Sequence, residues 1–322
     1  MADKARLEHL AAAIQQAVTS YDPNNPSSWI PIQDAMEKPR RATEPPAVFI
    51  MKQRFHTIQN ICLVAALEMG LLQTLAAKKG ENLTASNLAL ESGYDKVSIA
   101  RIMRMMAAIG FADETGYQTY TTNPVTIRQS DPESMGGVVL TNEMTYPLVS
   151  KIREYLRQNK PCDITQTPPP YDFAMGDSVW ETFTKNVVWK KGFDDSMTAR
   201  NKTLSIPWHV KFPVQERLAE RKSSTPPIIV DIGGNQGVDL NRFIQHFPNL
   251  EYHAKAMKPH SRLLINEIRD DMDMLMLFLS NGMERTKTQW TELLAKVEPP
   301  LQLVEIWSVP VDQQSVLESC LA

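Results

Sequence analysis

The residues with the clearest chemical potential lie in one short stretch of the chain. A β-branched run over 228–232 includes a carboxylate and is followed by three glycines within five residues. This order predicts a buried strand, a tight turn and a helix over 238–247. Glycine lets a backbone approach a ligand closely and helix N–H groups favour electron-rich atoms, so the stretch indicates a nucleotide or cofactor cradle. A strand-to-helix turn without a ligand is the plainer alternative. The candidate cofactor-binding residues are Asp231, Gly233, Gly234 and Gly237.

Length and composition set the class of protein. The chain has 322 residues, enough for two domains, with 43% apolar residues, 22% charged residues and a formal net charge of −3. This balance favours a globular protein and argues against a broad nucleic-acid-binding surface. The longest apolar run, 61–72, contains Glu68 and is too short to span a bilayer, and the charged N-terminus lacks the apolar core of a signal peptide. We therefore expect a cytoplasmic protein that binds neither nucleic acid nor a membrane.

The cysteines argue against a metal site. Cys62, Cys162 and Cys320 lie far apart and lack the spacing of metal ligands. Their odd number predicts free thiols in a reducing compartment. We expect no bound metal ion.

The N-terminal part of the chain predicts helices joined by linkers. Apolar residues recur at helical spacing over 4–20 and again over 47–76, while Pro-rich linkers are expected over 22–28 and 39–46. The second helical region is apolar on a broad surface. Such a surface is typical of a buried core, and it also suits an obligate subunit interface.

The segment 82–124 predicts a winged helix, in which two helices are followed by a two-stranded hairpin. Thr84 is a suitable N-cap for a helix over 85–92, and Gly110 ends a second helix over 96–109. The second helix carries basic residues, as a DNA-reading helix does. Its isoleucines and methionines nevertheless favour a buried scaffold helix.

A linker helix is expected to join this part to the glycine turn. Asp177 or Ser178 is placed to cap that helix, which is rich in aromatic residues. Aromatic side chains in such a helix pack against neighbours more often than they contact a substrate. The apolar candidates for substrate contact are Met175, Trp180 and Met276.

The C-terminal part predicts strands alternating with helices. A buried strand is expected over 261–267 and a helix rich in Met and Leu over 272–279. The segments 301–307 and 314–321 fit two final strands that form an antiparallel closing pair.

Together these features resemble the fungal secondary-metabolite O-methyltransferases, which are related to the plant small-molecule O-methyltransferases. The resemblance covers most of the chain, and its motifs as a set are far more specific than the glycine turn alone. These motifs are Ala65-Ala-Leu-Glu-Met-Gly-Leu-Leu, the winged helix at 82–124, Tyr171-Asp-Phe-Ala-Met-Gly with Trp180, Val230-Asp-Ile-Gly-Gly-Asn-Gln-Gly, Arg262-Leu-Leu-Ile-Asn-Glu, and Gly282-Met-Glu-Arg-Thr with Trp290.

The resemblance implies an α/β protein with an N-terminal, mostly helical winged-helix dimerisation domain and a doubly wound, Rossmann-like methyltransferase domain. It implies S-adenosylmethionine as cofactor, a hydroxylated small molecule as substrate, and an intertwined homodimer. We expect an N-terminal helix and linker over 1–46, the winged-helix domain over 47–165, and the linker helix with the methyltransferase-like domain over 166–322. By the same resemblance, Glu267 and Glu284 are the carboxylates that flank and orient a catalytic histidine.

The chain departs from the family pattern in its second half. Asn235 replaces the middle glycine of the turn, which is tolerable because asparagine adopts left-handed backbone angles. Only 85 residues of the 322 follow Gly237, whereas the rest of a doubly wound domain needs about 150. We therefore expect a truncated domain that lacks the ribose-binding acidic residue, the segment beside the adenine, and the His-Asp-Trp motif with its general base. The nearby histidines that could replace this base are His246, His253 and His260.

Three functions fit this sequence. The first is methyl transfer to a hydroxyl group of a polyketide-like small molecule. The second is a different reaction, such as dehydration or pericyclic ring closure, in which Asp172, Glu284 or Arg285 would polarise a carbonyl group. The third is a regulatory or binding subunit without turnover, which forms a heterodimer with a full-length relative. An exon skipped in the gene model would also account for the short domain.

Overall fold

The computed structural model describes residues 3–24, 28–160, 167–203, 206–219, 237–248, 263–268, 271–308 and 314–321. At 139, 201–203, 218–219, 266–268 and 271–272 it describes the backbone alone. The chain forms two compact units, Met1–Ser130 and Asp131–Ala322, which are described separately below. The domain boundaries expected at 46/47 and 165/166 stay predictions, since compactness alone does not define a domain.

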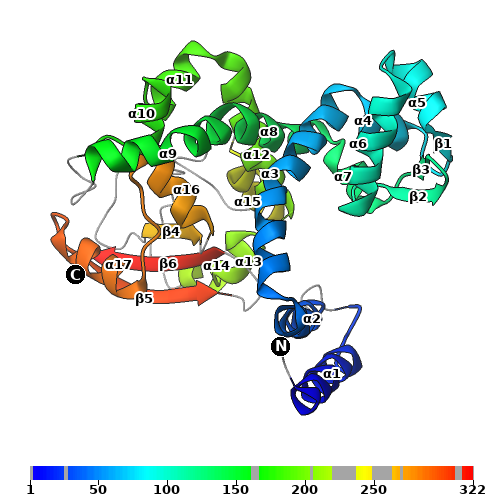
Figure 1. The fold of residues 1–322 in the computed structure, drawn as a ribbon. Helices are drawn as coiled ribbons and strands as arrows, with labels where there is room; N and C mark the ends of the chain where they lie inside the picture. Colours follow the sequence, from blue (N-terminus) through cyan, green and yellow to red (C-terminus); the bar gives the residue numbers. More distant parts are fainter. Residues whose placement is uncertain are drawn as a thin grey trace. The chain divides into compact units, whose positions relative to one another are not determined.

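The first unit begins with helices that largely confirm the N-terminal prediction (Figure 1). In α1 the side chain of Asp3 accepts a hydrogen bond from the Arg6 amide at 2.8 Å, which satisfies a helix N–H group. The left-handed Gly70, with φ 70°, breaks the second apolar region into two helices. The four helices are α1 (Lys4–Thr19), α2 (Ile30–Thr43), α3 (Pro46–Glu68) and α4 (Leu71–Ala77).

The linker predicted over 39–46 is wrong for most of its length, because α2 continues through Pro39 to Thr43 and α3 begins at Pro46. Proline removes one helix N–H group, and the flanking charges pair at helical spacing. Arg40 and Arg41 both donate to Glu37, at 2.6 and 2.7 Å, one turn earlier. Pairs of this kind contribute only about 0.2–0.5 kcal/mol each, well below the roughly 3 kcal/mol cost of an interior proline, so they support this turn without offsetting that cost.

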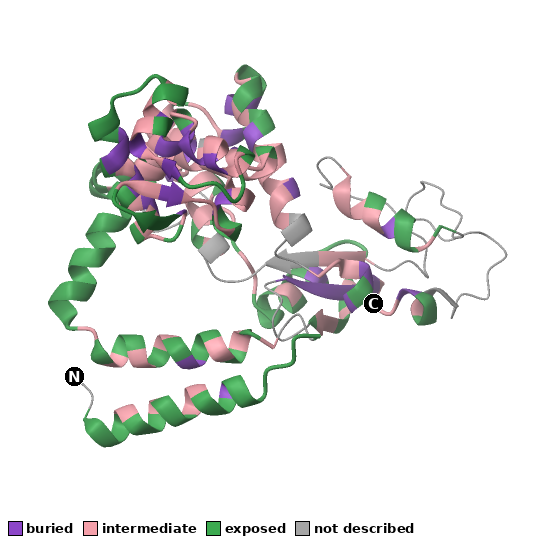
Figure 2. Ribbon diagram, turned by 90° about the vertical axis from the view of Figure 1, so that its right-hand side faces the viewer, coloured by how far each residue is buried: buried purple, intermediate pink, exposed green. Residues whose placement is uncertain are grey.

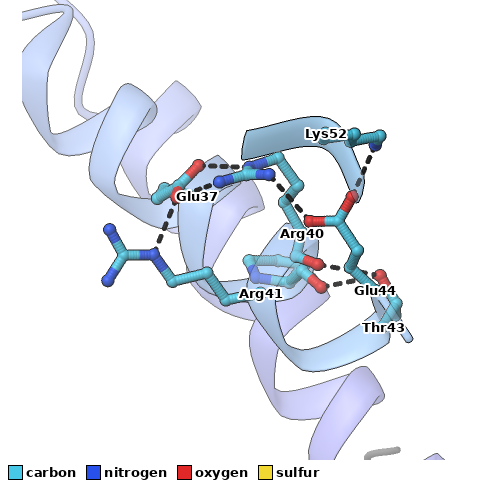
Figure 3. Close-up of polar contacts among 7 residues, drawn as sticks. Glu37, Arg40, Arg41, Thr43, Glu44 and Lys52 are labelled. Atoms are coloured by element: carbon cyan, nitrogen blue, oxygen red, sulfur yellow. Dashed lines mark hydrogen bonds and ion pairs between the residues drawn. The ribbon is translucent and has the colours of Figure 1, made fainter. Parts of the chain in front are cut away.

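The same ion pairs continue across the junction between α2 and α3 (Figure 3). Glu44 accepts from Arg40 of α2 at 3.0 Å and from Lys52 of α3 at 2.5 Å. The guanidinium groups of Arg40 and Arg41 lower the pKa of Glu37 to about 2. Because most of these side chains are exposed, the network orients the junction more than it stabilises it.

The rest of the first unit contains the predicted winged helix. Thr84 and Asn87 form a capping box at the start of α5, and the left-handed Gly93, with φ 74°, ends that helix. The sheet has the order β1-β3-β2, with antiparallel pairs. Its elements are β1 (Leu83–Thr84), α5 (Ala85–Ser92), α6 (Lys96–Ala108), β2 (Asp113–Gly116), β3 (Thr119–Thr121) and α7 (Pro124–Gln129).

The second of the paired helices, α6, buries its apolar face as predicted. Ile99, Met103 and Met106 are fully buried, and the Tyr120 hydroxyl from β3 donates to the Ala100 carbonyl at 3.3 Å. Apolar burial of this extent stabilises the unit by about 1.5–3 kcal/mol for each large side chain. The apolar content of α6 thus builds the core of the winged helix.

In the residues that the structure describes, the second unit is mostly helical around a three-stranded sheet (Figure 1). Ser178 and Glu181 form a capping box at the start of α11, so the predicted helix start is confirmed. The helices are α8 (Pro132–Leu140), the π-helical η1 (Thr141–Thr145), α9 (Tyr146–Asn159), α10 (Pro170–Met175), α11 (Val179–Lys185), α12 (Val187–Thr203), α13 (Trp208–Lys211), α14 (Val214–Ala219), α15 (Val238–His246), α16 (Asp271–Ser280) and α17 (Lys287–Lys296).

The sheet of the second unit has the order β4-β6-β5. β6 (Gln314–Leu321) pairs antiparallel with both β4 (Leu263–Ile268) and β5 (Leu301–Ser308), which confirms the predicted closing pair. β4 and β5 therefore run in the same direction, with helices α16 and α17 connecting them. The strand expected over 228–232 lies outside the described residues, and the predicted shortening of the domain stays a prediction.

The central strand β6 is buried on both faces along nearly its whole length. On one face Phe212, Phe243 and Val316 pack together, with Trp208 stacked on Phe243 at 4.9 Å between ring centroids. A fully buried carboxylate, Glu318, also lies in this strand and accepts from the Trp307 indole at 3.2 Å. Burial of a carboxylate requires such donors, and here they tie β5 to β6.

The length and apolar content of a helix decide whether it can cross a membrane. Within the described ranges no single helix is both long and apolar enough to cross a bilayer. The bent pair of α3 and α4, which meet at 59°, satisfies the length and composition criterion only when the two are joined.

Candidate functional site

The glycine turn is described only at its last residue. Asp231, Gly233 and Gly234 lie outside the described residues, so their predicted role as cofactor ligands stays a prediction. Gly237 has left-handed angles, φ 70° and ψ 23°, and forms the N-cap of α15. No heavy atom of the described chain lies within 4 Å of the position that a Cβ would take there. The N–H groups of the first turn of α15 are the groups that would favour an electron-rich ligand.

A half-buried arginine lies within electrostatic reach of the start of α15. Arg200 of α12 is within electrostatic reach of Asp239, in the first turn of α15, and of Glu284. Burial holds the pKa of Arg200 below its ordinary value, although both carboxylates oppose that shift. Asp239 also lies 3.7 Å from Arg242. We call Arg200, Asp239 and Glu284 the polar wall.

The loop between α16 and α17 carries one member of the polar wall, Glu284. The Glu284 amide donates to Asp273 Oδ1 at 2.8 Å, which ties the loop to the first turn of α16. The Arg285 guanidinium lies over the Trp290 ring, 5.2 Å from its centroid. Thr286 then caps α17. The Met-Glu-Arg-Thr motif is thus held in place by contacts on both sides.

The other predicted catalytic carboxylate, Glu267, lies in β4. Its backbone pairs with Ser315 of β6, and its side chain is outside the described set. Its position near the end of a strand agrees with the sequence pattern. Its relation to Glu284 stays a prediction.

Two of the predicted substrate residues lie on helices that pack together. Met175 of α10 packs against a buried cluster that also contacts Phe278 and Leu279 of α16. Met276 of α16 lies against Gly282, where an added Cβ would come within 3.3 Å of the Met276 Cβ. An apolar surface therefore adjoins the loop that carries Glu284.

The third predicted substrate residue, Trp180, lies on the surface of this unit. Its side chain is 65% exposed and contacts Phe183 edge-on, with 6.0 Å between ring centroids. Within this unit the indole packs on the outside of α11. Its predicted role in substrate contact stays a prediction.

Of the three histidines that could replace the general base, the structure describes His246. His253 and His260 lie outside the described residues, and His246 ends α15, about 13 Å along the helix from Gly237. His246 packs beside the buried His209, with 5.2 Å between ring centroids. Burial, assisted by His246 and Arg242, lowers the pKa of His209 to about 4, so His209 is neutral at pH 7. This pair lies at the far end of α15 from the polar wall.

Of the groups proposed to polarise a carbonyl, Asp172 lies on α10. Burial, together with nearby Glu181, raises the pKa of Asp172.

Among the residues that the structure describes, no three His, Cys, Asp or Glu side chains gather as a metal site would require.

Sequence reasoning found Glu284 but missed Arg200, Asp239 and Asp273. Arg200 looks like any arginine of a helix surface, because its burial depends on elements distant in the chain. Asp239, two residues after the last glycine, carried a weak signal as an acidic residue in a first helical turn. Asp273 carried none, since its partner follows 11 residues later.

Comparison with curated sequences finds relatives of one kind. The chain is 26% identical over 174 residues to the O-methyltransferase penC of Penicillium thymicola, which covers 52% of this chain and 42% of that protein. It is 22% identical over 249 residues to the 16-O-methyltransferase bsc6 of Alternaria brassicicola, covering 75% and 59%. By sequence, this chain is a relative of the fungal secondary-metabolite O-methyltransferases. It spans about half the length of these two relatives. No family model matches it.

Solved structures agree on the fold of this family. The chain superposes on a complex of LepI with S-adenosylmethionine with a TM-score of 0.83 at 18% identity, over 100% of both chains. It superposes on OxaC in complex with S-adenosylhomocysteine and oxaline with a TM-score of 0.77 at 19% identity, again over 100% of both. A structure described as a pericyclic reaction enzyme gives 0.82 at 18% identity, over 99% of this chain and 100% of that one. The mixed α/β fold of the O-methyltransferases is therefore confirmed.

Proposed function

We propose that the chain binds S-adenosylmethionine beside the start of α15 and methylates a hydroxyl group of a polyketide-like small molecule. The observation that carries this proposal is the polar wall: a half-buried guanidinium, Arg200, within electrostatic reach of both Asp239 and Glu284. Asp239 lies in the first turn of α15, and Glu284 lies two residues after Gly282, which contacts Met276. The names of the fungal relatives support the same reaction class.

The chain's own residues divide the work in this proposal. S-adenosylmethionine, when bound, supplies a methyl group on a positively charged sulfur. The N–H groups in the first turn of α15, which follows Gly237, bind the electron-rich atoms of the cofactor. Glu284 accepts a hydrogen bond from the acceptor hydroxyl and then takes its proton, and Arg200 stabilises the negative charge that develops on the oxygen. Met276, which is 36% exposed, offers an apolar surface to the substrate.

Two measurements test this function. Calorimetric titration with S-adenosylhomocysteine should show binding, and tritiated S-adenosylmethionine should label hydroxylated aromatic acceptors. Arg200→Met should lower the rate of label transfer by about 10- to 100-fold, because a charge-assisted interaction is lost. The matched control Arg157→Met, on the exposed side of α9, should leave the rate unchanged. Absence of both binding and transfer in the wild-type chain would overturn the proposal.

A second function is favoured by two observations. The chain lacks the His-Asp-Trp motif that supplies the family's general base, and its fold matches a pericyclic reaction enzyme with a TM-score of 0.82. In this alternative the polar wall polarises a carbonyl group and the substrate cyclises or loses water without methylation. Product formation from a polyketide-derived intermediate without any methyl donor would support it. A strict requirement for S-adenosylmethionine turnover would exclude it.

We also propose that the chain is a dimer through α3. Four consecutive apolar residues, 48–51, cover every face of this helix near its start and are 42% to 50% exposed. Phe55, Ile58 and Ile61 extend the same exposure along the helix, which Figure 2 shows as largely green segments. A helix that is apolar all round is normally covered. The partner is a second copy or, in a regulatory role, a full-length relative.

Light scattering tests this assembly. Ile50→Glu with Phe55→Glu should convert the dimer to a monomer, since each charge would be desolvated in the interface. Leu90→Glu, at an 85% exposed apolar position of α5, is the matched control and should leave the dimer intact. A wild-type chain that is monomeric both alone and mixed with a full-length relative would contradict the proposal.

A further inference from the structure

The loop from Asn281 to Thr286 is tied down along its whole length. Asn281 adopts left-handed angles, with φ 51°, and donates through its side chain to the Thr167 carbonyl at 2.7 Å. The Gly282 amide donates to the Met276 carbonyl at 3.1 Å. At the other end, Thr286 and Gln289 form the capping box of α17. The loop is therefore a preformed structure within this unit.

One contact joins this loop to a residue outside the two helix ends that flank it. Asp273, in the first turn of α16, accepts from the Glu284 amide at 2.8 Å across 11 residues of sequence. A backbone amide bonded to a carboxylate is a charge-assisted contact, which is stronger than a bond between neutral groups. This contact holds the backbone of Glu284, whose side chain is part of the polar wall.

The opposite side of Glu284 is constrained by charge. Arg200 is half-buried and lies within electrostatic reach of its carboxylate, so solvent screens the attraction only in part. Asp273 of α16 thus holds the backbone of Glu284, and Arg200 of α12 attracts its side chain. Loss of the backbone contact would let the carboxylate move relative to Arg200.

We infer that Asp273 is a positioning residue, which acts through the Glu284 backbone to set the direction of the Glu284 carboxylate toward the acceptor. This inference rests on the proposed function of the polar wall. Asp273 itself touches no reacting atom. Its contribution is a fixed loop conformation, which matters because a small displacement of a polar group in a site lowers the rate steeply.

Hydrogen exchange at the Glu284 amide tests the contact directly, whatever reaction the protein performs. Asp273→Ala should speed exchange of that amide at least about 10-fold. Asp273→Asn, which keeps an acceptor oxygen, should restore most of the protection. The matched control is Asp95→Ala, because Asp95 accepts from the Ser98 amide at the same distance, 2.8 Å, in the winged helix. Unchanged exchange at Glu284 in Asp273→Ala overturns the inference.

A double-mutant cycle tests the functional half with tritiated S-adenosylmethionine and a hydroxylated aromatic acceptor. Asp273→Ala should lower kcat/KM by about 10- to 100-fold, Asp273→Asn by less than about 5-fold, and Asp95→Ala by less than about 2-fold. If Asp273 acts through Glu284, Asp273→Ala combined with Glu284→Gln should be no slower than Glu284→Gln alone. Additive losses overturn the inference. A wild-type chain without transfer refutes the proposed function, while the exchange experiment still decides the positioning contact.

Discussion

The winged helix of the first unit and the polar wall of the second unit are built in opposite ways. In the winged helix each element begins or ends at a residue that acts on its own neighbours, such as Thr84 at the start of α5 and Asp95 at the start of α6. In the polar wall three segments far apart in the chain contribute one side chain each. Local bonds make the first region readable from sequence, whereas the second exists only once α12, α15 and the 281–286 loop are assembled.

The core of the winged helix should be the most sensitive position. Met103→Ala removes a fully buried side chain of α6 and should lower the free energy of unfolding by about 2–5 kcal/mol. Chemical denaturation measures this change. The control Val97→Ala, at a 64% exposed position of the same helix, should change it by less than about 0.5 kcal/mol. Equal effects would show that α6 is not the core helix described here.

Acid should weaken the second unit through His209. The pKa of His209 is about 4 in the folded chain and about 6.5 when unfolded, so the unfolded chain binds more protons between these values. Stability should therefore fall as the pH drops from 6.5 toward 4, by up to about 3 kcal/mol. Like burial, the neighbouring His246 and Arg242 disfavour protonation of His209.

Denaturation at pH 7 and pH 5 measures this effect. His209→Phe keeps the ring packed against Phe243 and should flatten the pH dependence in this window. His56→Phe, at an exposed position of α3, should leave the pH dependence of the wild type. An unchanged slope in His209→Phe would contradict the assignment.

Valine substitution at two left-handed glycines distinguishes an effect on stability from an effect on ligand binding. Gly237 and Gly93 have φ near 70° and have no described heavy atom within 4 Å of a Cβ position. Valine at either site should cost about 1–2 kcal/mol in unfolding free energy. Only Gly237→Val should also weaken S-adenosylhomocysteine binding, by about 30-fold or more in calorimetry. Equal affinity in Gly237→Val would remove the start of α15 from the ligand site.

The smallest effect is expected at a helix cap. Thr84→Ala removes the side-chain acceptor for the Asn87 amide and should lower the unfolding free energy by about 1 kcal/mol. Thermal denaturation measures it as a shift of a few degrees. Thr84→Ser keeps the acceptor and should remain close to the wild type, and a loss equal to that of alanine would exclude the cap as the cause.

Failures of prediction have physical causes in particular residues. The linker expected at Pro39 is helical because α2 packs against α1, with Ala35 buried, and helices in proteins are stabilised chiefly by such packing. Arg200 escaped notice because nothing in its own segment distinguishes it from an arginine on a fully exposed helix surface.

The sequence by itself determined the local elements and the ancestry. Caps at Thr84 and Ser178 and the left-handed Gly237 act over a few residues, so their rules apply before any packing. Only the tertiary structure decided that Asp273 holds the Glu284 backbone and that Arg200 lies within electrostatic reach of Glu284. Those contacts depend on which helices meet, and the free energy that brings them together comes from apolar burial across the whole unit rather than from the residues that form the site.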